Sequence, residues 1–250
     1  MKQKVPFSDL TYEKFRELAR RQDLSRHEKV GFPDDYREGK EERIFADVRR
    51  KLRALDDTGK IILEIGPGCS KLPLMLIALC EERNHQLHLV DSPEMLEQLP
   101  NKACVHKWPG RYPDEVGALF SQFNGRVDAV IAYSVIQYVF LEGNLWDFLD
   151  RSLSLLAEGG ELLFGDIPNV TMRKRFFSSA TGLECHRRFT GRNDPPEVHF
   201  NKPEPGQIDD SVVFAMLARA RAQGFHAWVL PQADDLPMAN RREDILIRKP

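Results

Sequence analysis

The sequence has few cysteines and no pair of them spaced as CxxC. Its four cysteines are scattered along 250 residues, at Cys69, Cys80, Cys104 and Cys185. This spacing matches neither a zinc-binding pattern nor the disulfide framework of a small secreted domain. We therefore expect free thiols in a reducing compartment and no metal site.

Long apolar runs and a strong excess of one charge are also lacking. No uninterrupted apolar stretch approaches the ~20 residues that a transmembrane helix needs, and the first residues, MKQKVPFSDL, lack the apolar core of a signal peptide. The 36 Lys and Arg residues nearly balance 38 Asp and Glu residues, giving a net charge of -2, whereas dedicated nucleic-acid binders are usually basic. These absences predict a cytoplasmic protein with no membrane or nucleic-acid partner.

From residue 60 onward the chain alternates between strand-like and helix-like stretches. We predict strands at residues 60–65, 86–90, 103–106, 128–133, 161–165, 225–230 and 244–248. The main helices are expected at 71–83, from Asn144 to Gly159–Gly160, and from Asp209 or Asp210 to Gly224. Repeated strand–helix units indicate an α/β fold, with a doubly wound, mainly parallel seven-stranded sheet. No helix fits between the last two strands, so an antiparallel C-terminal strand is expected.

Two regions lie outside this alternation. Residues 1–58 are predicted to form an N-terminal helical extension of the same domain, with a Gly/Pro-marked loop at 26–39. Residues 59–250 form the main domain, in which about 166–208 lack periodicity and are rich in Arg, Pro, Asn and Gly. We interpret this second stretch as an inserted cap over a substrate.

The stretch IILEIGPGCSK, residues 61–71, breaks from a strand into a glycine turn that opens a helix. Such a turn brings bare backbone close to a ligand. A dinucleotide fingerprint requires G-x-G-x-x-G, but Lys71 stands at the third glycine, and the P-loop pattern is absent. Glu64, two residues before the first glycine, disfavours a phosphate ligand and suits a cationic one.

The pattern ExGPGxS followed by LHLVDSPEML resembles the first two motifs of class I S-adenosylmethionine (SAM)-dependent methyltransferases. DAVIAYSVIQYV and LLAEGGELLFGD resemble the later strand motifs of the same family. The resemblance implies SAM as cofactor, with Glu64 near its methionine end and Asp91 holding the ribose hydroxyls. Ser70 departs mildly from the family pattern, and the third strand lacks the usual acid for the adenine, which leaves Trp108, Gly110 or Arg111 as the candidate adenine contacts. The expected cofactor-binding residues are Glu64, Gly66, Pro67, Gly68, Ser70, Asp91, Ser92, Met95, Trp108, Tyr133 and Ser134.

The acceptor is less well defined by the sequence. Tyr133-Ser134-Val135-Ile136 stands where nucleic-acid amino methyltransferases carry [ND]-P-P-[YF], which argues against that substrate class. Residues 167–201 hold six Lys/Arg against three acids, which fits either a solvated loop or an anionic small-molecule acceptor. We assign substrate contacts to Gln137, Arg173 and Arg175.

We look for a general base, which would take the proton of the methyl acceptor, among the titratable residues of the same region. His186, His199 and Asp166 are the candidate catalytic residues, and for each of them a structural or surface role is the alternative. The stretch GDIPNVTMRKRFFSS resembles methyltransferases encoded with bacterial surface-polysaccharide genes, which favours O-methylation of a sugar or its activated precursor. A non-catalytic protein of the same fold is the alternative function, and the oligomeric state stays open.

Overall fold

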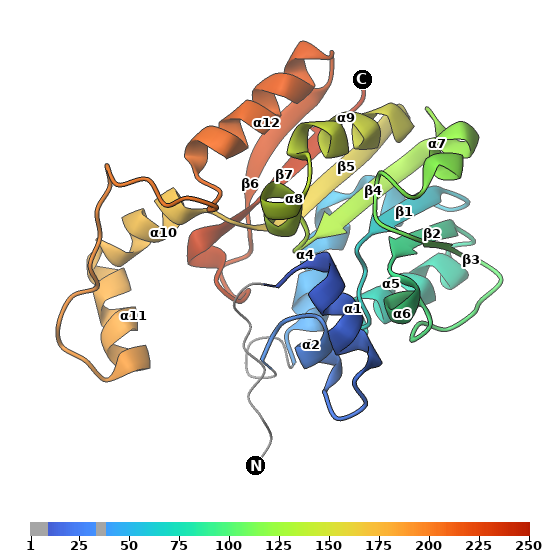
Figure 1. Ribbon diagram of the computed structural model, residues 1–250. Coiled ribbons are helices and arrows are strands. Elements are labelled where there is room, and N and C mark those ends of the chain that lie inside the picture. Colours follow the sequence, from blue (N-terminus) through green and yellow to red (C-terminus); the bar gives the residue numbers. More distant parts are fainter. Residues whose placement is uncertain (1–9, 34–38) are drawn as a thin grey trace.

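The computed structural model describes residues 10–33 and 39–250. In this part of the chain one sheet of seven strands has the order β3-β2-β1-β4-β5-β7-β6, and Figure 1 shows it between layers of helices. Neighbouring strands from β3 to β5 run parallel, whereas β7 is antiparallel to both β5 and β6. The strands are β1 Ile61–Ile65, β2 Gln86–Asp91, β3 Val105–Pro109, β4 Val127–Tyr133, β5 Leu156–Pro168, β6 His226–Pro231 and β7 Arg242–Arg248. The predicted fold class is confirmed.

Each face of the sheet carries its own apolar core. One core joins the sheet to α4 and α5, which supply buried Ile44, Val48 and Leu76. The other joins it to α7, α9 and α12 through residues such as Leu119, Phe148 and Met216. The helices of these layers are α4 Glu41–Lys51, α5 Lys71–Glu82, α6 Pro93–Leu96, α7 Gly117–Phe123, α8 Ile136–Glu142, α9 Leu145–Leu155 and α12 Asp210–Ala222. The two cores fix the sheet on both faces, and the carboxyl ends of its parallel strands β1, β2 and β4 lie together at one edge of the sheet.

Capping residues set most helix starts where the sequence predicts them. The Asn144 side chain accepts hydrogen bonds from the backbone N–H of Trp146 and Asp147 at the start of α9, and Asp209 caps α12. The predicted end of α9 at Gly159–Gly160 is wrong, because Leu156 already pairs with Val127 as the first residue of β5. The predicted bounds of the third strand are also wrong: it occupies Val105–Pro109 and pairs in register with β2.

The predicted loop at 26–39 contains a short helix. Helix α2, Arg26–Lys29, follows α1, Tyr12–Arg20, and starts with a capping box. The Glu28 backbone N–H donates to Ser25 Oγ at 3.1 Å, and the Ser25 N–H donates to Glu28 Oε2 at 2.8 Å. This reciprocal pair stabilises a helix too short to show a periodic pattern. Residues 34–38 of the predicted loop lie outside the described residues.

The stretch 166–208, predicted to be irregular, contains α10 Val170–Phe177 and α11 Ala180–Thr190. Asn169 caps α10 and Ser179 caps α11, which ends at Gly191 with a left-handed φ of 71°. Figure 1 shows these helices projecting from the body of the molecule. We call residues 169–207 the arm.

No helix in the described ranges is long and apolar enough to cross a bilayer.

Candidate cofactor and active site

The glycine turn after β1 has a backbone that other residues adopt only with strain. Gly66 has φ 68° and Gly68 has φ 64°. A Cβ at Gly66 would stand 2.7 Å from Val135 Cγ2, and one at Gly68 would stand 2.5 Å from Val30 Cγ1. The turn therefore needs glycine for both conformation and space. Its Gly68 N–H donates to Asp91 Oδ2 at 2.9 Å, which ties the turn to the end of β2.

A pocket opens at the carboxyl ends of β1, β2 and β4, where a sheet of this topology binds its ligands. It brings together nine of the residues predicted to bind the cofactor, from the ends of three strands and the segments that follow them. They are Glu64, Gly66, Pro67, Gly68, Ser70, Asp91, Met95, Tyr133 and Ser134. Gly110 and Arg111, which follow β3, complete this side of the pocket.

Two carboxylates dominate the electrostatics of the pocket. Glu64 is buried, and within the described structure its Oε2 has no hydrogen-bond partner. Burial, and then the charge of Asp91, raise the pKa of Glu64 to about 8. Burial also raises the pKa of Asp91 to about 6, although the N–H groups of Gly68 and Ser92 oppose this rise. Two adjacent carboxylates in an apolar pocket are destabilised as anions, and a cationic ligand would relieve this cost.

The pocket therefore fits the cofactor that the sequence motifs imply. SAM carries an ammonium and a sulfonium, both complementary to the unpartnered Glu64 oxygen. Asp91 accepts backbone hydrogen bonds on both oxygens, at 2.9 Å from Gly68 and 2.7 Å from Ser92. These bonds orient the carboxylate on the pocket wall, and each oxygen keeps a lone pair for a hydroxyl donor such as a ribose.

Three other predicted residues are not among the described residues that line the pocket. Ser92 caps α6, its Oγ accepting from the Met95 N–H at 3.3 Å. Trp108 donates its indole N–H to His88 Nδ1 at 3.0 Å. Gln137 donates its side-chain amide to the Ser134 carbonyl at 2.9 Å. Ser92 and Gln137 thus support pocket residues from behind, whereas Trp108 packs edge-on against Phe123, with ring centroids 6.1 Å apart.

Asp166 lies behind the pocket wall rather than on it. It is buried, has φ 60°, and accepts a hydrogen bond from the Ser134 hydroxyl. Arg242 Nη1 donates to the same Asp166 oxygen, Oδ2, at 2.7 Å. Ser134, also with a positive φ of 59°, is the pocket-lining member of this pair. A role of Asp166 toward an acceptor would therefore pass through the Ser134 hydroxyl.

The basic and histidine residues of the arm are placed elsewhere. Arg173 forms an ion pair with Glu204 at 2.6 Å and lines a second cavity within the arm, together with His199. Arg175 pairs with Asp210 at 2.5 Å. His186 lies in α11, its ring 6.4 Å from that of Phe177. None of these four predicted residues is among the described residues that line the main pocket.

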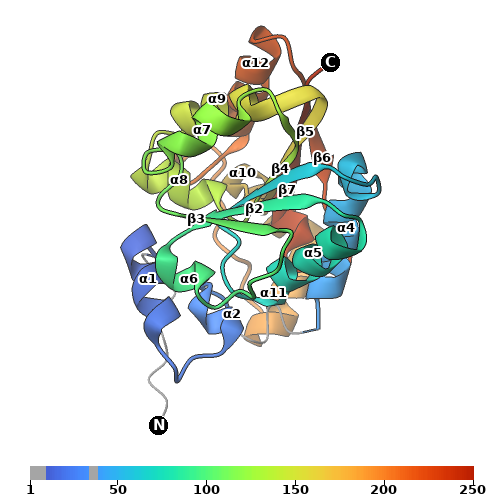
Figure 2. The ribbon, with the colours of Figure 1, turned by 90° about the vertical axis from the view of Figure 1, so that its right-hand side faces the viewer.

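Most of the residues that cover the pocket were not predicted from the sequence, although the loop that contains Phe32 was considered as part of a cap. The N-terminal segment contributes Tyr12, Phe15, Val30 and Phe32, and α8 and its surroundings contribute Tyr138, Val139, Glu142, Tyr112 and Phe148. Figure 2 shows α1 and α2 grouped with α6 and α8 at one end of the sheet. The sequence shows that Tyr12, Phe15, Leu18 and Ala19 form one apolar helix face. It does not show the surface on which this face packs, because that surface is made of residues far away in the chain.

Comparisons of structure place the fold among known proteins. The chain is similar to NodS, an N-methyltransferase from Bradyrhizobium japonicum WM9 in complex with S-adenosyl-L-homocysteine (SAH), with TM-score 0.60, 16% identity, and coverage of 97% of this chain and 100% of NodS. It is similar to the plantazolicin methyltransferase BpumL in complex with a monoazolic analog and SAH, with TM-score 0.57, 13% identity, and coverage of 95% and 98%.

A third similar structure is the CurJ carbon methyltransferase, with TM-score 0.54 and 15% identity. The match covers 94% of this chain, which spans 63% of the CurJ chain. No family model matches the sequence, and neither does any curated protein. At these identities the likeness shows the fold: the chain has the Rossmann-like fold of class I SAM-dependent methyltransferases.

Proposed function

We propose that the protein is a SAM-dependent methyltransferase that acts on a small molecule. The observation that carries the proposal is the buried Glu64 carboxylate, which lines a pocket together with Asp91 and the Gly66–Gly68 turn and has an oxygen without a hydrogen-bond partner in the described structure. A nicotinamide dinucleotide would place phosphates at this turn, next to Glu64 and Asp91, two acids that would repel them when ionised. SAM has the charge and the hydroxyl groups that these residues complement.

Bound SAM supplies a methyl group on a sulfonium, already activated for displacement. The protein's task is then to align the acceptor with that methyl and to exclude water. Tyr133 and Ser134 stand at the end of β4, where they line the pocket next to Glu64. Phe15, which packs edge-on against Tyr138 with ring centroids 4.9 Å apart, closes the pocket with an apolar wall. These residues would enclose the transfer.

The acceptor that we infer from the sequence is a sugar or a sugar precursor methylated on oxygen. The basic excess of residues 167–201 supports an anionic form, but Arg173 and Arg175 are paired to acids of their own. The charged residues described in the pocket lining are Glu64, Asp91, Glu142 and Arg111. With Glu64 and Asp91 facing SAM, and Arg111 paired with Glu142 at 3.7 Å, the described lining keeps no free cation for an anionic acceptor and suits an uncharged one better. The similar structures are named as N- and C-methyltransferases, so the fold leaves the acceptor atom open.

A thermal-shift screen with SAM, SAH, NAD and NADP tests the cofactor. SAM or SAH at 100 times its Kd should stabilise the protein by about 2.7 kcal/mol, whereas NAD and NADP should have no effect. Stabilisation by NAD, or by none of the four, would refute the proposal. Methyl transfer from SAM to sugars, sugar nucleotides and small amines then separates an enzyme from a non-catalytic protein that only binds SAM.

A further inference from the structure

Helix α1 reaches the pocket from a part of the chain that precedes the motif-bearing sheet. Tyr12, in its first turn, lines the pocket together with Asp91. Burial, and then the negative charge of Asp91, raise the pKa of the Tyr12 phenol, so the hydroxyl stays protonated and available as a donor. The Arg111 guanidinium lies over the Tyr12 ring, 5.7 Å from its centroid. Tyr12 is thus between the ribose-binding acid and the loop after β3.

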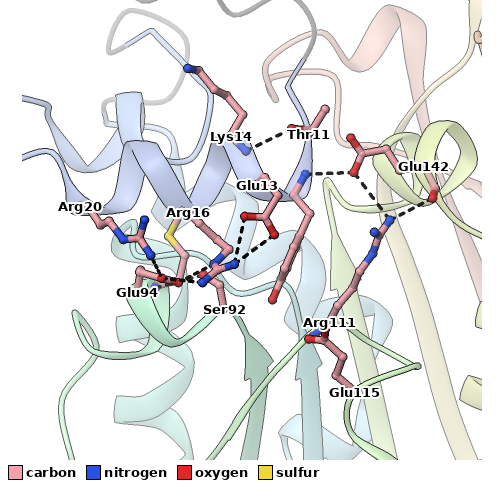
Figure 3. Close-up of polar contacts among 12 residues, drawn as sticks. Thr11, Glu13, Lys14, Arg16, Arg20, Ser92, Glu94, Arg111, Glu115 and Glu142 are labelled. Carbon is pink, nitrogen blue, oxygen red and sulfur yellow. Dashed lines mark hydrogen bonds and ion pairs between the residues drawn. The ribbon is translucent and has the colours of Figure 1, made fainter.

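Two anchors hold Tyr12 in this position, and Figure 3 shows both. The first is on α8, where Glu142 Oε2 accepts the Tyr12 backbone N–H at 3.0 Å. The Arg111 side chain donates to the Glu142 carbonyl at 3.0 Å, so the same residue fixes both the helix start and the guanidinium. The start of α1 therefore depends on a residue of the opposite pocket wall.

The second anchor is an ion-pair cluster on α6, which we call the Glu94 latch. Arg16 donates to both Glu94 oxygens, at 3.0 Å from Nε and 2.9 Å from Nη2, and Arg20 donates to Glu94 Oε1. Only 12% of the Glu94 side chain is exposed. The hydrogen bond from Arg16 is the main cause that lowers the pKa of Glu94 to about 2. The latch thus stays ionised at any pH near neutrality.

In the sequence, Glu94 of the latch follows closely after Asp91, the residue predicted to hold the ribose. Asp91 and Met95 line the pocket, Ser92 caps α6 between them, and Glu94 points toward α1 in Figure 3. One short segment therefore carries both the acid that would hold the ribose and the acid that holds α1. A shift of α1 would therefore reach the segment that carries Asp91, and a ligand at Asp91 would lie in the pocket that Tyr12 also lines.

From this arrangement we propose that Tyr12 is a cofactor-binding residue, covering the ribose–adenine part of SAM, and that Glu94 is the residue that positions it. The proposal rests on the proposed function. Ligand entry and release then require α1 to lift, which breaks the partly exposed Glu94 latch. Because salt screens such pairs, both the affinity for the cofactor and its residence time should fall as ionic strength rises.

The test uses the full chain with SAH as probe, measured by calorimetry and by dissociation kinetics. Tyr12→Ala should raise the Kd for SAH about 3- to 10-fold because it removes the ring that covers the ligand, and Glu94→Gln should raise it by a similar factor because it breaks the charge-assisted latch. Tyr12→Phe should retain most of the affinity if the ring provides the cover. Glu94→Gln should also speed dissociation and reduce the dependence on salt.

Asp23→Asn serves as the matched control, since it breaks the exposed Arg21–Asp23 pair just beyond the same helix without touching the pocket. Should Glu94→Gln fail to fold, Arg16→Gln breaks the latch from the other side. Wild-type affinity in both Tyr12→Ala and a folded latch variant would overturn the inference. If wild-type protein binds neither SAH nor SAM, the proposed function itself fails, an outcome distinct from the failure of the cover.

Discussion

The N-terminal segment 11–33 and the arm 169–207 differ in an instructive way. The arm has the basic charge and the unusual composition of a substrate cap, yet its Arg173 and Arg175 pair with acids away from the pocket. The N-terminal segment has an ordinary amphipathic pattern, and it contributes Tyr12 and Phe15 to the pocket. The composition therefore indicated the arm as the substrate cap, whereas the packing places the N-terminal segment at the pocket. Variants in the pocket, in the N-terminal segment and in the arm test this difference.

Gly68→Ala should have the largest effect, because it inserts a Cβ between the cofactor turn and the N-terminal segment. The φ of 64° strains any other residue, and the Cβ would stand 2.5 Å from Val30 Cγ1. We expect a loss of about 1–3 kcal/mol in the free energy of unfolding, and SAH binding too weak to measure. Denaturant unfolding and calorimetry provide the two readings.

Gly59→Ala isolates the steric part of that loss. Gly59 has a similar φ of 69°, but no described atom lies within 4 Å of the position that an added Cβ would occupy. The free energy of unfolding of this variant should therefore fall only by the cost of backbone strain. An equal loss in both variants would mean that Val30 yields freely, and that the N-terminal segment does not press on the turn.

Asp91→Ala is expected to weaken SAM binding by about 1–3 kcal/mol, the range for hydrogen bonds to a charged group. Calorimetry on the folded variant measures it, with the exposed Asp57→Ala as a control outside the pocket. Unchanged affinity would show that Asp91 only orders Gly68 and Ser92 and does not contact the ribose.

Much of the site and most of the sheet were predictable, because local signals define them. Glycine turns, strand ends and caps such as Asn144 act over a few residues, so Glu64 and Asp91 could be assigned from neighbouring letters. The cover could not be predicted, since Tyr12 meets Glu142 across 130 residues. Helix α10 of the arm was missed because it is short and its cap, Asn169, follows directly on a strand.

Glu64→Gln should change how stability depends on pH. The pKa of Glu64 is raised to about 8 in the folded protein from an ordinary 4.5, so the folded state holds this proton more tightly. The contribution of Glu64 to the free energy of unfolding is therefore fully present below about pH 4.5 and is lost as pH rises toward 8. A shift of one pKa unit corresponds to about 1.4 kcal/mol, so ligand-free wild type should lose more than that across this window.

The glutamine of the Glu64→Gln variant cannot ionise, so this variant should lose less stability over the same pH range. Thermal melts between pH 5 and 8.5 measure the difference, with exposed Glu82→Gln at the far end of α5 as control. The affinity of wild type for SAM should rise over this window as Glu64 ionises, and the variant should bind more weakly with a flatter profile. Parallel stability curves for Glu64→Gln and wild type would show that Glu64 is already ionised in the free protein.

Replacing Arg173, Lys174 and Arg175 together by Ala should have the smallest effect on the cofactor. These cations pair with Glu204 and Asp210 and lie outside the described pocket lining, so the Kd for SAH should stay within about 2-fold of wild type. If the arm closes over an anionic acceptor during turnover, the same variant should raise the acceptor KM, and by less at high salt.

A second triple variant decides what the arm does. Replacing Arg187, Arg188 and Arg192 by Ala removes the same charge from exposed positions of α11 and the residues just after it. An increase in KM confined to the first triple would assign α10 to the acceptor, whereas equal increases in both would indicate long-range attraction of an anion by the whole arm. Normal turnover of every acceptor in both variants would leave the pocket walls as the part that selects the substrate. In that case the arm would supply only charge at the surface, whereas the N-terminal segment would contact the bound cofactor.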